Sequence, residues 1–262
     1  MRIISFNANG LRSAANKGFF DWFATQDADI LCVQETKAQE HQLSGEAGVR
    51  NGCVPDGYKA WFRDASTRKG YSGVAIYSRR EPDSVRTAIG WEPFDEEGRY
   101  LEARFGNLCV VSMYVPSGSS GELRQGFKFE VMAWLRPILD QWLASGRDYV
   151  LCGDWNIVRS ERDIRNWKSN QKNSGCLPPE REWLNGLCAS DAGWVDAYRA
   201  LHPEGQDYTW WSNRGAARAK NVGWRIDYQL TTPSLRKRLR ACAITPSPRF
   251  SDHAPFAVDY AE

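Results

Sequence analysis

Short apolar runs of strand length recur along the whole chain of 262 residues and constrain its fold more than any other feature. Runs this short favour β-strands, and only a few stretches show helical spacing. Strands are expected at 3–6, 29–34, 58–63, 73–78, 84–89, 100–105, 108–115, 149–153, 208–212, 225–231 and 255–260. Helices are expected at 17–26, 122–144 and 179–188, with a kink or break at Pro137. Many strands and few helices predict an α/β (α+β) fold in which two mixed sheets pack face to face with helices outside.

The composition is that of a globular protein. Hydrophobic residues make up 42% and charged residues 25%, which excludes a disordered or fibrous chain. No repeat or long Pro/Gly linker divides the sequence, so residues 1–262 are predicted to form a single domain. No apolar run reaches the roughly eighteen residues of a membrane span, and the start shows no signal-peptide pattern. We expect a cytoplasmic protein, nucleoid-associated if bacterial, that is monomeric and does not bind membranes.

Cysteine and charge counts narrow the function further. Seven cysteines without metal-ligand spacing predict reduced thiols, with neither disulfides nor a zinc site. A formal net charge of +2 is too small to attract nucleic acid over the whole surface, so any polyanion site requires local clustering of basic residues. Twelve tryptophans are unusually many, and they suit stacking on sugars or bases as well as core packing.

Polar side chains interrupt the apolar pattern where the predicted strands end. These positions are Asn7, Asn9, Glu35, Asp154, Asn156, Asp227, Asp252 and His253. Asn7 and Asn9 lie two residues apart, so their side chains point the same way if the backbone is extended. A single carboxylate at a strand end is usually a solvated turn residue or a cap, and only the combined set indicates a site at the ends of the strands.

Such a set fits phosphodiester hydrolysis assisted by a hard cation. Oxygen donors favour Mg²⁺, or Mn²⁺, over zinc, which makes Glu35 and Asp252 candidate metal ligands. Phosphoryl transfer needs an activated water and positive charge beside the phosphate. Asp154 is the candidate to orient or deprotonate the water, and His253 to contact a phosphate oxygen. Asp227 is a candidate partner that fixes the histidine tautomer.

Seven motifs identify a family at these same residues. They are NANGLR at 7–12, QETK at 34–37, GYSG at 70–73, YVPSG at 114–118, GDWN at 153–156, GWRID at 223–227 and SDHAP at 251–255. In this order they resemble the apurinic/apyrimidinic (AP) endonucleases of the exonuclease III family over essentially the whole chain. GDWN or SDH alone would indicate only the wider superfamily that also contains DNase I, sphingomyelinases and inositol-polyphosphate phosphatases.

The resemblance implies a fold and a role for each site residue. The implied fold is a four-layered, DNase I-like α/β sandwich with the site at one end of its two sheets. Glu35 is the implied principal metal ligand, with Asn7, Asn9 and Asp252 near the ion. Asp154 and Asn156 are then beside the attacking water and the phosphate, Tyr114 contacts the scissile phosphate, and His253, paired with Asp227, holds a non-bridging oxygen.

The resemblance also implies how damaged DNA is recognised. Trp210, Trp224 and Ile226 match the family's apolar pocket for an extruded sugar without a base, whereas Trp211 is expected in the core. Residues 166–175 suit either DNA contacts or a solvated polar loop, and the family carries a similar loop there. The residues expected to contact DNA are Arg12, Lys37, Tyr71, Arg99, Lys128, Lys172, Asn173 and Arg214. Ser117, the small residues of 118–121 and Arg214 depart from the pattern of some relatives, which changes how kinked DNA is held.

The expected function is that of a Mg²⁺-dependent DNA repair enzyme. It hydrolyses the phosphodiester 5′ to an abasic site in duplex DNA, trims blocked 3′ ends and degrades intact 3′ ends more weakly. The first alternative is a 3′–5′ exonuclease or 3′-phosphodiesterase that does not nick abasic sites. A phosphodiesterase for lipid or inositol phosphates would need an apolar membrane loop or clustered basic residues. A non-catalytic DNA-binding module would not gather carboxylates where they repel phosphate.

Overall fold

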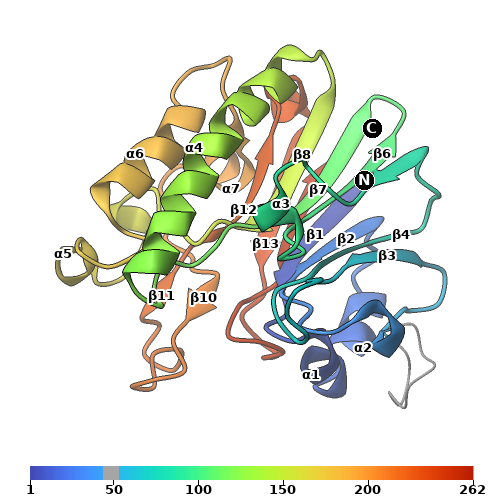
Figure 1. Ribbon diagram of the computed structural model, residues 1–262, viewed down its shortest axis with the longest axis horizontal. Coiled ribbons are helices and arrows are strands. Elements are labelled where there is room, and N and C mark those ends of the chain that lie inside the picture. Colours follow the sequence, from blue (N-terminus) through green and yellow to red (C-terminus); the bar gives the residue numbers. More distant parts are fainter. Residues whose placement is uncertain (44–52, 262) are drawn as a thin grey trace.

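The computed structural model describes residues 1–43 and 53–261, and two six-stranded mixed sheets face each other within it (Figure 1). The first sheet has the order β13-β14-β1-β2-β4-β3, formed by β13 (Leu239–Ile244), β14 (Phe256–Tyr260), β1 (Arg2–Asn7), β2 (Ile30–Gln34), β4 (Val74–Ser78) and β3 (Lys59–Arg63). The second has the order β5-β6-β7-β8-β12-β9, formed by β5 (Ser84–Arg86), β6 (Tyr100–Phe105), β7 (Leu108–Tyr114), β8 (Asp148–Asp154), β12 (Asp227–Thr231) and β9 (Val195–Asp196). A separate ribbon pairs β10 (Trp210–Trp211) with β11 (Gly223–Trp224).

Helices cover the outer faces of both sheets (Figure 1). On the first sheet lie α1 (Leu11–Asn16) and α2 (Phe19–Ala24), and on the second lie α4 (Glu122–Ala144) and α6 (Pro178–Leu187). The shorter helices are α3 (Glu92–Asp95), α5 (Trp167–Asn170), α7 (Ala197–Leu201), η1 (Glu40–Gln42), η2 (Glu161–Asp163) and η3 (Pro233–Arg238). The order helix, sheet, sheet, helix confirms the predicted four-layered sandwich.

Three apolar clusters hold these four layers together. Leu135 and Leu139 of α4 pack against the outer face of the second sheet, and Phe19 and Phe23 of α2 against the first. Between the sheets, side chains such as Ile3, Cys32 and Ile76 of the first sheet meet Val110 and Val150 of the second. The middle cluster also holds a buried amide, because Gln229 donates from Nε2 to the carbonyl oxygens of Ile3 and Phe256, both at 3.0 Å. Each such polar contact fixes the register of one sheet on the other.

Several elements differ from the expected ones. The helix expected at 17–26 is shorter and follows an unpredicted helix, α1, because Gly18 adopts a left-handed backbone (φ 83°) between them. The strand expected at 225–231 begins only at Asp227, since Trp224 belongs to β11. Pro137 does not break α4, because buried residues on both sides of it pack on the sheet and offset the lost hydrogen bond.

Strand register brings the polar strand ends to one edge of the sandwich. Asn7 pairs with Gln34 in the parallel β1–β2 ladder, so Glu35 lies just beyond the same edge. Asp154 at the end of β8 pairs with both Tyr114 and Asp227. Ser5 pairs with the first residue of β14, which places residues 252–253 at this edge as well. Residues more than two hundred positions apart in sequence therefore meet.

Phe19 tests how far the outer helical layer stabilises the fold. Its buried ring stacks on Phe6 with centroids 4.3 Å apart, so Phe19→Ala leaves a cavity and should lower the free energy of unfolding by about 3–5 kcal/mol. Leu123→Ala, at a side chain that is 92% exposed, should change it by less than about 0.5 kcal/mol. Urea unfolding followed by circular dichroism measures both values. Equal effects in the two variants would contradict this account of the packing.

Candidate active site

A cleft of about 850 Å³ opens at the edge where the polar strand ends meet. Of the residues predicted from sequence, the cleft is lined by Asn9, Glu35, Lys37, Tyr114, Asp154, Asn156, Lys172, Asn173, Trp210, Arg214, Trp224, Ile226, Asp252 and His253. Asn7 and Asp227 are buried immediately behind this lining. The cleft also includes Ser117 and the neighbouring glycine-rich turn.

Asp154 lies at the centre of the cleft and is only 1% exposed. Its Oδ2 accepts a hydrogen bond from Nδ2 of Asn7 in the other sheet at 2.9 Å. Asn156 donates to the same carboxylate twice, from its backbone N–H at 2.8 Å and from Nδ2 at 3.2 Å. Burial and then the nearby carboxylate of Asp227 raise the pKa of Asp154, so without a cation this carboxylate is unusually basic.

Glu35 and Asp252 stand on the first-sheet side of the cleft. Glu35 accepts from Nδ2 of Asn7 at 3.1 Å and pairs with Nζ of Lys37 at 2.7 Å. Burial opposes the charged form of Glu35, but the ammonium of Lys37 and hydrogen bonds from Tyr114 and Asn7 together outweigh it and lower the pKa. Asn9 links the two acids through Lys37. Its Nδ2 donates to Asp252 at 2.8 Å, and its Oδ1 accepts from the same ammonium that pairs with Glu35. An ammonium therefore already neutralises oxygens that are candidate ligands for a metal ion.

The backbone turns out of the strands at three of these positions. Asn9, Glu35 and Asn156 have φ values of 44°, 51° and 51°, in the left-handed region that non-glycine residues rarely adopt. The extended geometry considered for the pair Asn7/Asn9 is therefore wrong at Asn9. Strain of this kind clusters at functional sites, where surrounding contacts hold it in place.

His253 and Asp227 form a buried pair at the back of the cleft. Nδ1 of His253 is 2.9 Å from Oδ2 of Asp227, and its Nε2 is 3.9 Å from Oδ2 of Asp154. Burial would lower the pKa of His253, but the carboxylates of Asp227, Asp154 and Asp252 together outweigh it and raise the pKa. Oδ1 of Asp227 has no hydrogen-bond partner among the described residues, which is costly for a buried carboxylate oxygen.

The donor atoms fit a hard cation. Asp154, Asp227 and His253 offer ligand atoms within 4.8 Å of one another, and the carboxylates of Glu35 and Asp252 reach the same cleft. Apart from the histidine nitrogen the donors are carboxylate oxygens, which a hard cation prefers. The carboxylates that such an ion requires can come from Asp154 and Asp227, or from Glu35 and Asp252.

Tyr114 is supported from behind by a buried arginine. The guanidinium of Arg99 lies 4.5 Å from the centre of the Tyr114 ring and donates from Nη1 to the Tyr114 carbonyl oxygen at 3.0 Å. Arg99 also donates to the hydroxyl of Tyr71 at 3.0 Å and pairs with Glu97 at 2.5 Å. Because Arg99 is 1% exposed, the expectation that it faces DNA is wrong. The charge of Arg99 is instead paired with Glu97 inside the protein.

Two tryptophans and an isoleucine form an apolar wall on the other side of the cleft. Trp210 and Trp224 are cross-strand partners with rings at 90° and centroids 5.8 Å apart, and Ile226 is buried in the same cluster. Nε1 of Trp210 donates to Asp252 at 3.1 Å, which joins the wall to the acidic centre. Trp211 is buried in a different cluster, as expected.

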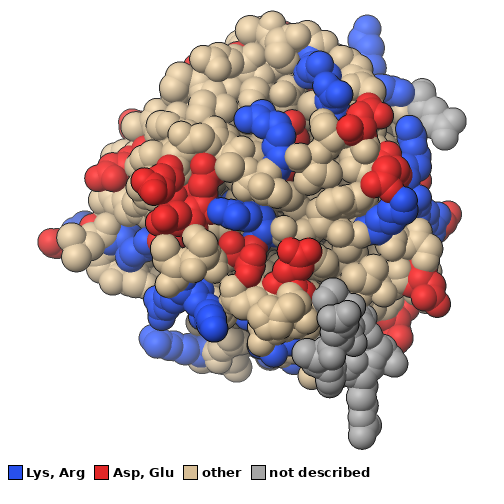
Figure 2. Space-filling view, turned by 45° about the vertical axis from the view of Figure 1, so that its right-hand side comes forward, with Lys and Arg blue, Asp and Glu red and all other residues tan. Residues whose placement is uncertain are grey.

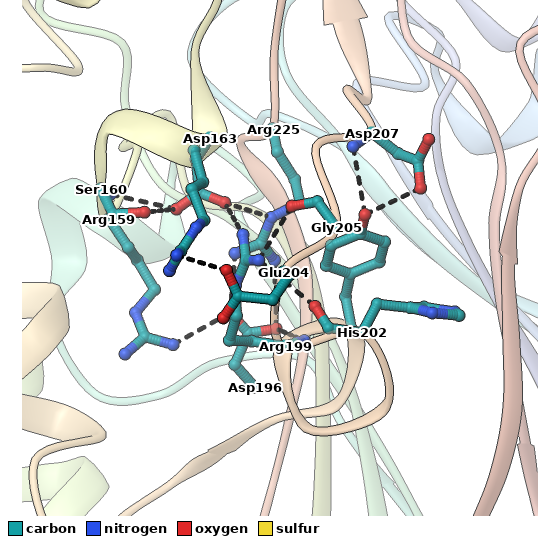
Figure 3. Close-up of polar contacts among 12 residues, drawn as sticks. Arg159, Ser160, Asp163, Asp196, Arg199, His202, Glu204, Gly205, Asp207 and Arg225 are labelled. Atoms are coloured by element: carbon teal, nitrogen blue, oxygen red, sulfur yellow. Dashed lines mark hydrogen bonds and ion pairs between the residues drawn. The ribbon is translucent and has the colours of Figure 1, made fainter.

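A buried charge network anchors the strand that carries this wall (Figure 3). Arg225 lies between Trp224 and Ile226 and binds Asp196 through two bonds of 3.0 and 2.8 Å and Asp163 at 2.7 Å. Arg199 and Arg159 add two further ion pairs, as shown in Figure 3, with bonds of 2.7 Å to Asp163 and 2.9 Å to Asp196, so that three guanidinium groups share two carboxylates.

Sequence reasoning gave Arg225 no role although it stands inside the GWRID motif. Asp163 and Asp196 carried no signal at all, because nothing local shows which acids a buried arginine will meet. A fully buried guanidinium must be paired, so the alternation of this arginine with apolar neighbours was the one available clue.

The remaining expected DNA contacts divide into exposed and buried residues. Arg12, Lys172, Asn173 and Arg214 are exposed, whereas Lys37 is bound to Glu35. Lys128 is fully buried and pairs with Glu180 at 2.6 Å, so the expectation that it faces the DNA backbone is wrong. Basic and acidic side chains intermingle on the face shown in Figure 2, in keeping with the small net charge. Local groups of residues, not a field of one sign, must recognise a polyanion.

Comparison with known proteins agrees with this geometry. The model of the endonuclease/exonuclease/phosphatase family matches residues 4–253. The chain belongs to this family. It is 38% identical over 259 residues to the DNA repair nuclease APEX1 of Danio rerio, covering 98% of this chain and 81% of that protein. It is 36% identical over 259 residues to an exodeoxyribonuclease of Bacillus subtilis, covering 97% of each.

A solved structure shows the same fold. The AP endonuclease of Archaeoglobus fulgidus superposes with a TM-score of 0.82 at 28% identity, over 99% of each chain. The protein is therefore a hydrolytic DNA nuclease of the AP endonuclease/exonuclease III type within this family. The family is metal-dependent, in keeping with the oxygen donors of the cleft. Among the described residues, no helix is both long enough and apolar enough to cross a membrane.

Gly175 tests how tightly the cleft wall is built. A Cβ at Gly175 would lie 2.9 Å from the Asn156 carbonyl oxygen and 3.1 Å from Cζ3 of Trp224, whereas one at Gly106 would meet nothing within 4 Å. Both glycines have positive φ, so alanine at either should cost about 1–2 kcal/mol of stability. Only Gly175→Ala should also reduce turnover on DNA, on the order of 10-fold or more, because it displaces Asn156. Steady-state kinetics and thermal melts of both variants test this prediction. Equal turnover in the two variants would contradict it.

Proposed function

We propose that the protein is a Mg²⁺-dependent endonuclease that hydrolyses the phosphodiester 5′ to an abasic site in duplex DNA. The products are a 3′-hydroxyl and a 5′-deoxyribose phosphate. The same site is proposed to act as a 3′-phosphodiesterase and, more weakly, as a 3′–5′ exonuclease. The observation that carries this proposal is the apolar wall of Trp210, Trp224 and Ile226 in the same cleft as the acidic centre. Such a wall suits an extruded sugar, and a nucleotide without a base has no pairing to lose when it is flipped.

The acidic centre supplies residues for each part of the hydrolysis. Asp154 is proposed to take the proton of the attacking water, since its carboxylate is buried and its pKa is raised. Asn156 orients that carboxylate through its two hydrogen bonds. His253, held by Asp227, is proposed to donate to a non-bridging phosphate oxygen, and Tyr114 to contact the scissile phosphate.

A cation completes the charge balance of the cleft. We propose that Glu35 is its principal ligand, with Asp252, Asn7 and Asn9 beside it, and that Mn²⁺ substitutes for Mg²⁺. When bound, the ion neutralises charge on the phosphate in the transition state. Lys37 contacts Glu35 and Asn9, so we propose that binding of the ion displaces this ammonium from them.

Exposed residues around the cleft are proposed to hold the duplex. Lys172, Asn173 and Arg214 line the cleft on the side of the apolar wall. Arg12 and Tyr71 are further proposed contacts, from the α1 and the 70–73 segments. We also propose that residues 1–262 act as one catalytic domain, as a monomer in the cytoplasm.

One alternative concerns the substrate and not the chemistry. A 3′–5′ exonuclease or 3′-phosphodiesterase without AP-site nicking would use the same acidic centre, and two relatives carry the name exodeoxyribonuclease. The two functions differ in whether the apolar wall accepts an internal abasic sugar or only a chain end.

Cleavage of an end-labelled duplex with one internal tetrahydrofuran abasic analogue tests the proposal. With Mg²⁺ the protein should produce a single nick 5′ to the analogue, and EDTA should abolish it. Asp154→Ala should lose most turnover yet keep its affinity for the duplex, because it removes the proposed base and not the DNA contacts. An undamaged duplex with a recessed 3′ end runs in parallel. Shortening of the recessed end without a nick at the analogue would establish the alternative.

Trp224 should determine selectivity between the two substrates. Trp224→Ala removes one side of the apolar wall without touching the carboxylates, so it should lower kcat/KM for the abasic duplex on the order of 10-fold or more. The effect on the recessed 3′ end should be several times smaller. The ratio of the two kcat/KM values, measured with the same preparation, removes any effect of partial unfolding. An unchanged ratio would mean that the wall does not select the abasic sugar.

A further inference from the structure

Lys128 is a buried cation directly behind the catalytic turn. It lies on the inner face of α4 and is 0% exposed, as is its partner Glu180 on α6. Its Nζ is 2.6 Å from Oε1 of Glu180 and donates to the backbone carbonyl oxygen of Asn156 at 2.8 Å. The ammonium therefore joins an outer helix to the turn that carries Asn156.

That carbonyl belongs to a residue in a strained conformation. Asn156 has φ 51°, and hydrogen bonds with three residues hold it there. Its backbone N–H binds Asp154, its Nδ2 donates to the carbonyl oxygen of Val115 at 3.0 Å, and its own carbonyl accepts from Lys128. A left-handed asparagine persists only where surrounding contacts fix it, and within residues 1–43 and 53–261 Lys128 is the hydrogen-bond donor to its carbonyl oxygen.

Glu180 holds the neighbouring segment of the cleft wall. Its Oε2 accepts from the backbone N–H of Gly175 at 2.6 Å and of Leu177 at 3.0 Å. The carbonyl oxygen of Gly175 in turn accepts from the N–H of Val158 at 2.8 Å, and both Gly175 and Leu177 line the cleft. The ion pair thus connects the catalytic turn at 154–158 to the end of the 166–175 loop.

We infer that Lys128 is a positioning residue for the hydrolysis, acting through the carbonyl of Asn156 to hold the Asn156–Asp154 pair in its working geometry. Glu180 balances its charge and fixes the adjacent wall. The inference rests on the proposed role of Asp154 and adds to it a residue that no substrate touches. If the ion pair were purely structural, its loss would lower turnover only as far as it lowers stability. This difference distinguishes a positioning role from a structural one.

The experiment separates the effect of the Lys128 ammonium on turnover from its effect on stability. Lys128→Met leaves the carboxylate of Glu180 buried and unpaired, so both stability and turnover should fall. In the double variant Lys128→Met/Glu180→Gln no buried charge is unpaired, and the Gln oxygen can still accept from Gly175 and Leu177. Its melting temperature should return toward that of the wild type. Its kcat should remain lower by about 10- to 100-fold, with KM changed by less than about 3-fold.

Two further variants keep the test decisive. Glu180→Gln alone retains the bond from Lys128 to Asn156, so it should keep a kcat within about 3-fold of the wild type even if its melting temperature falls. Arg136→Met removes an exposed pair with Asp140 on the same helix and should change neither quantity. Recovery of kcat together with stability in the double variant would overturn the inference. So would a loss of kcat in Glu180→Gln as large as in Lys128→Met.

Assays on two substrates distinguish a failure of the proposed function from a failure of the inference about Lys128. Each variant is compared with the wild type on the abasic duplex and on the recessed 3′ end. If the wild type leaves the abasic analogue intact, the proposed substrate is wrong, and the role of Lys128 is still decided on the recessed end.

Discussion

The buried carboxylate of Asp154 is the constraint on which the rest of the site depends. A carboxylate that is 1% exposed requires hydrogen-bond donors, because burying an unpaired charge costs several kcal/mol. Asn7 provides one donor from the opposite sheet, and Asn156 provides two from the turn after β8. The two sheets must therefore meet in one register at this edge. The same arrangement crowds Asp154 with Glu35 and Asp227, so the negative charge of the cleft favours a bound cation before phosphate enters.

The strained turns show how the fold is adapted to this site. Asn9, Glu35 and Asn156 each leave a strand in a left-handed conformation, which directs their polar atoms into the cleft. Strain of this kind costs of order 1–3 kcal/mol per residue and has to be offset by the surroundings. Lys37 contacts two of these residues and Lys128 the third. Two lysines that look equivalent in sequence thus hold the first-sheet and second-sheet sides of the cleft.

Buried cations account for much of the positive charge near the site. Arg99, Lys128 and Arg225 are each at most 1% exposed and pair with acids inside the protein. Burial removes them from direct contact with a polyanion, so the charge left for DNA lies on fewer, exposed residues such as Lys172 and Arg214. The pairs stiffen the walls of the cleft instead, and a pocket that selects a substrate by size needs stiff walls.

The sequence by itself determined the layered fold class and, through the family resemblance of its motifs, most of the residues that line the cleft. Apolar periodicity predicted two sheets with outer helices, and the motifs around Glu35, Asp154 and His253 indicated phosphodiester chemistry, because local patterns record strand ends and residue types. It could not show that Lys128 and Arg99 turn inward, that Gly18 separates two helices, or that Arg225 meets acids far away in the chain. Only the tertiary structure decided these points. Burial of a long charged side chain, and the partner it then requires, depend on which distant elements pack against it.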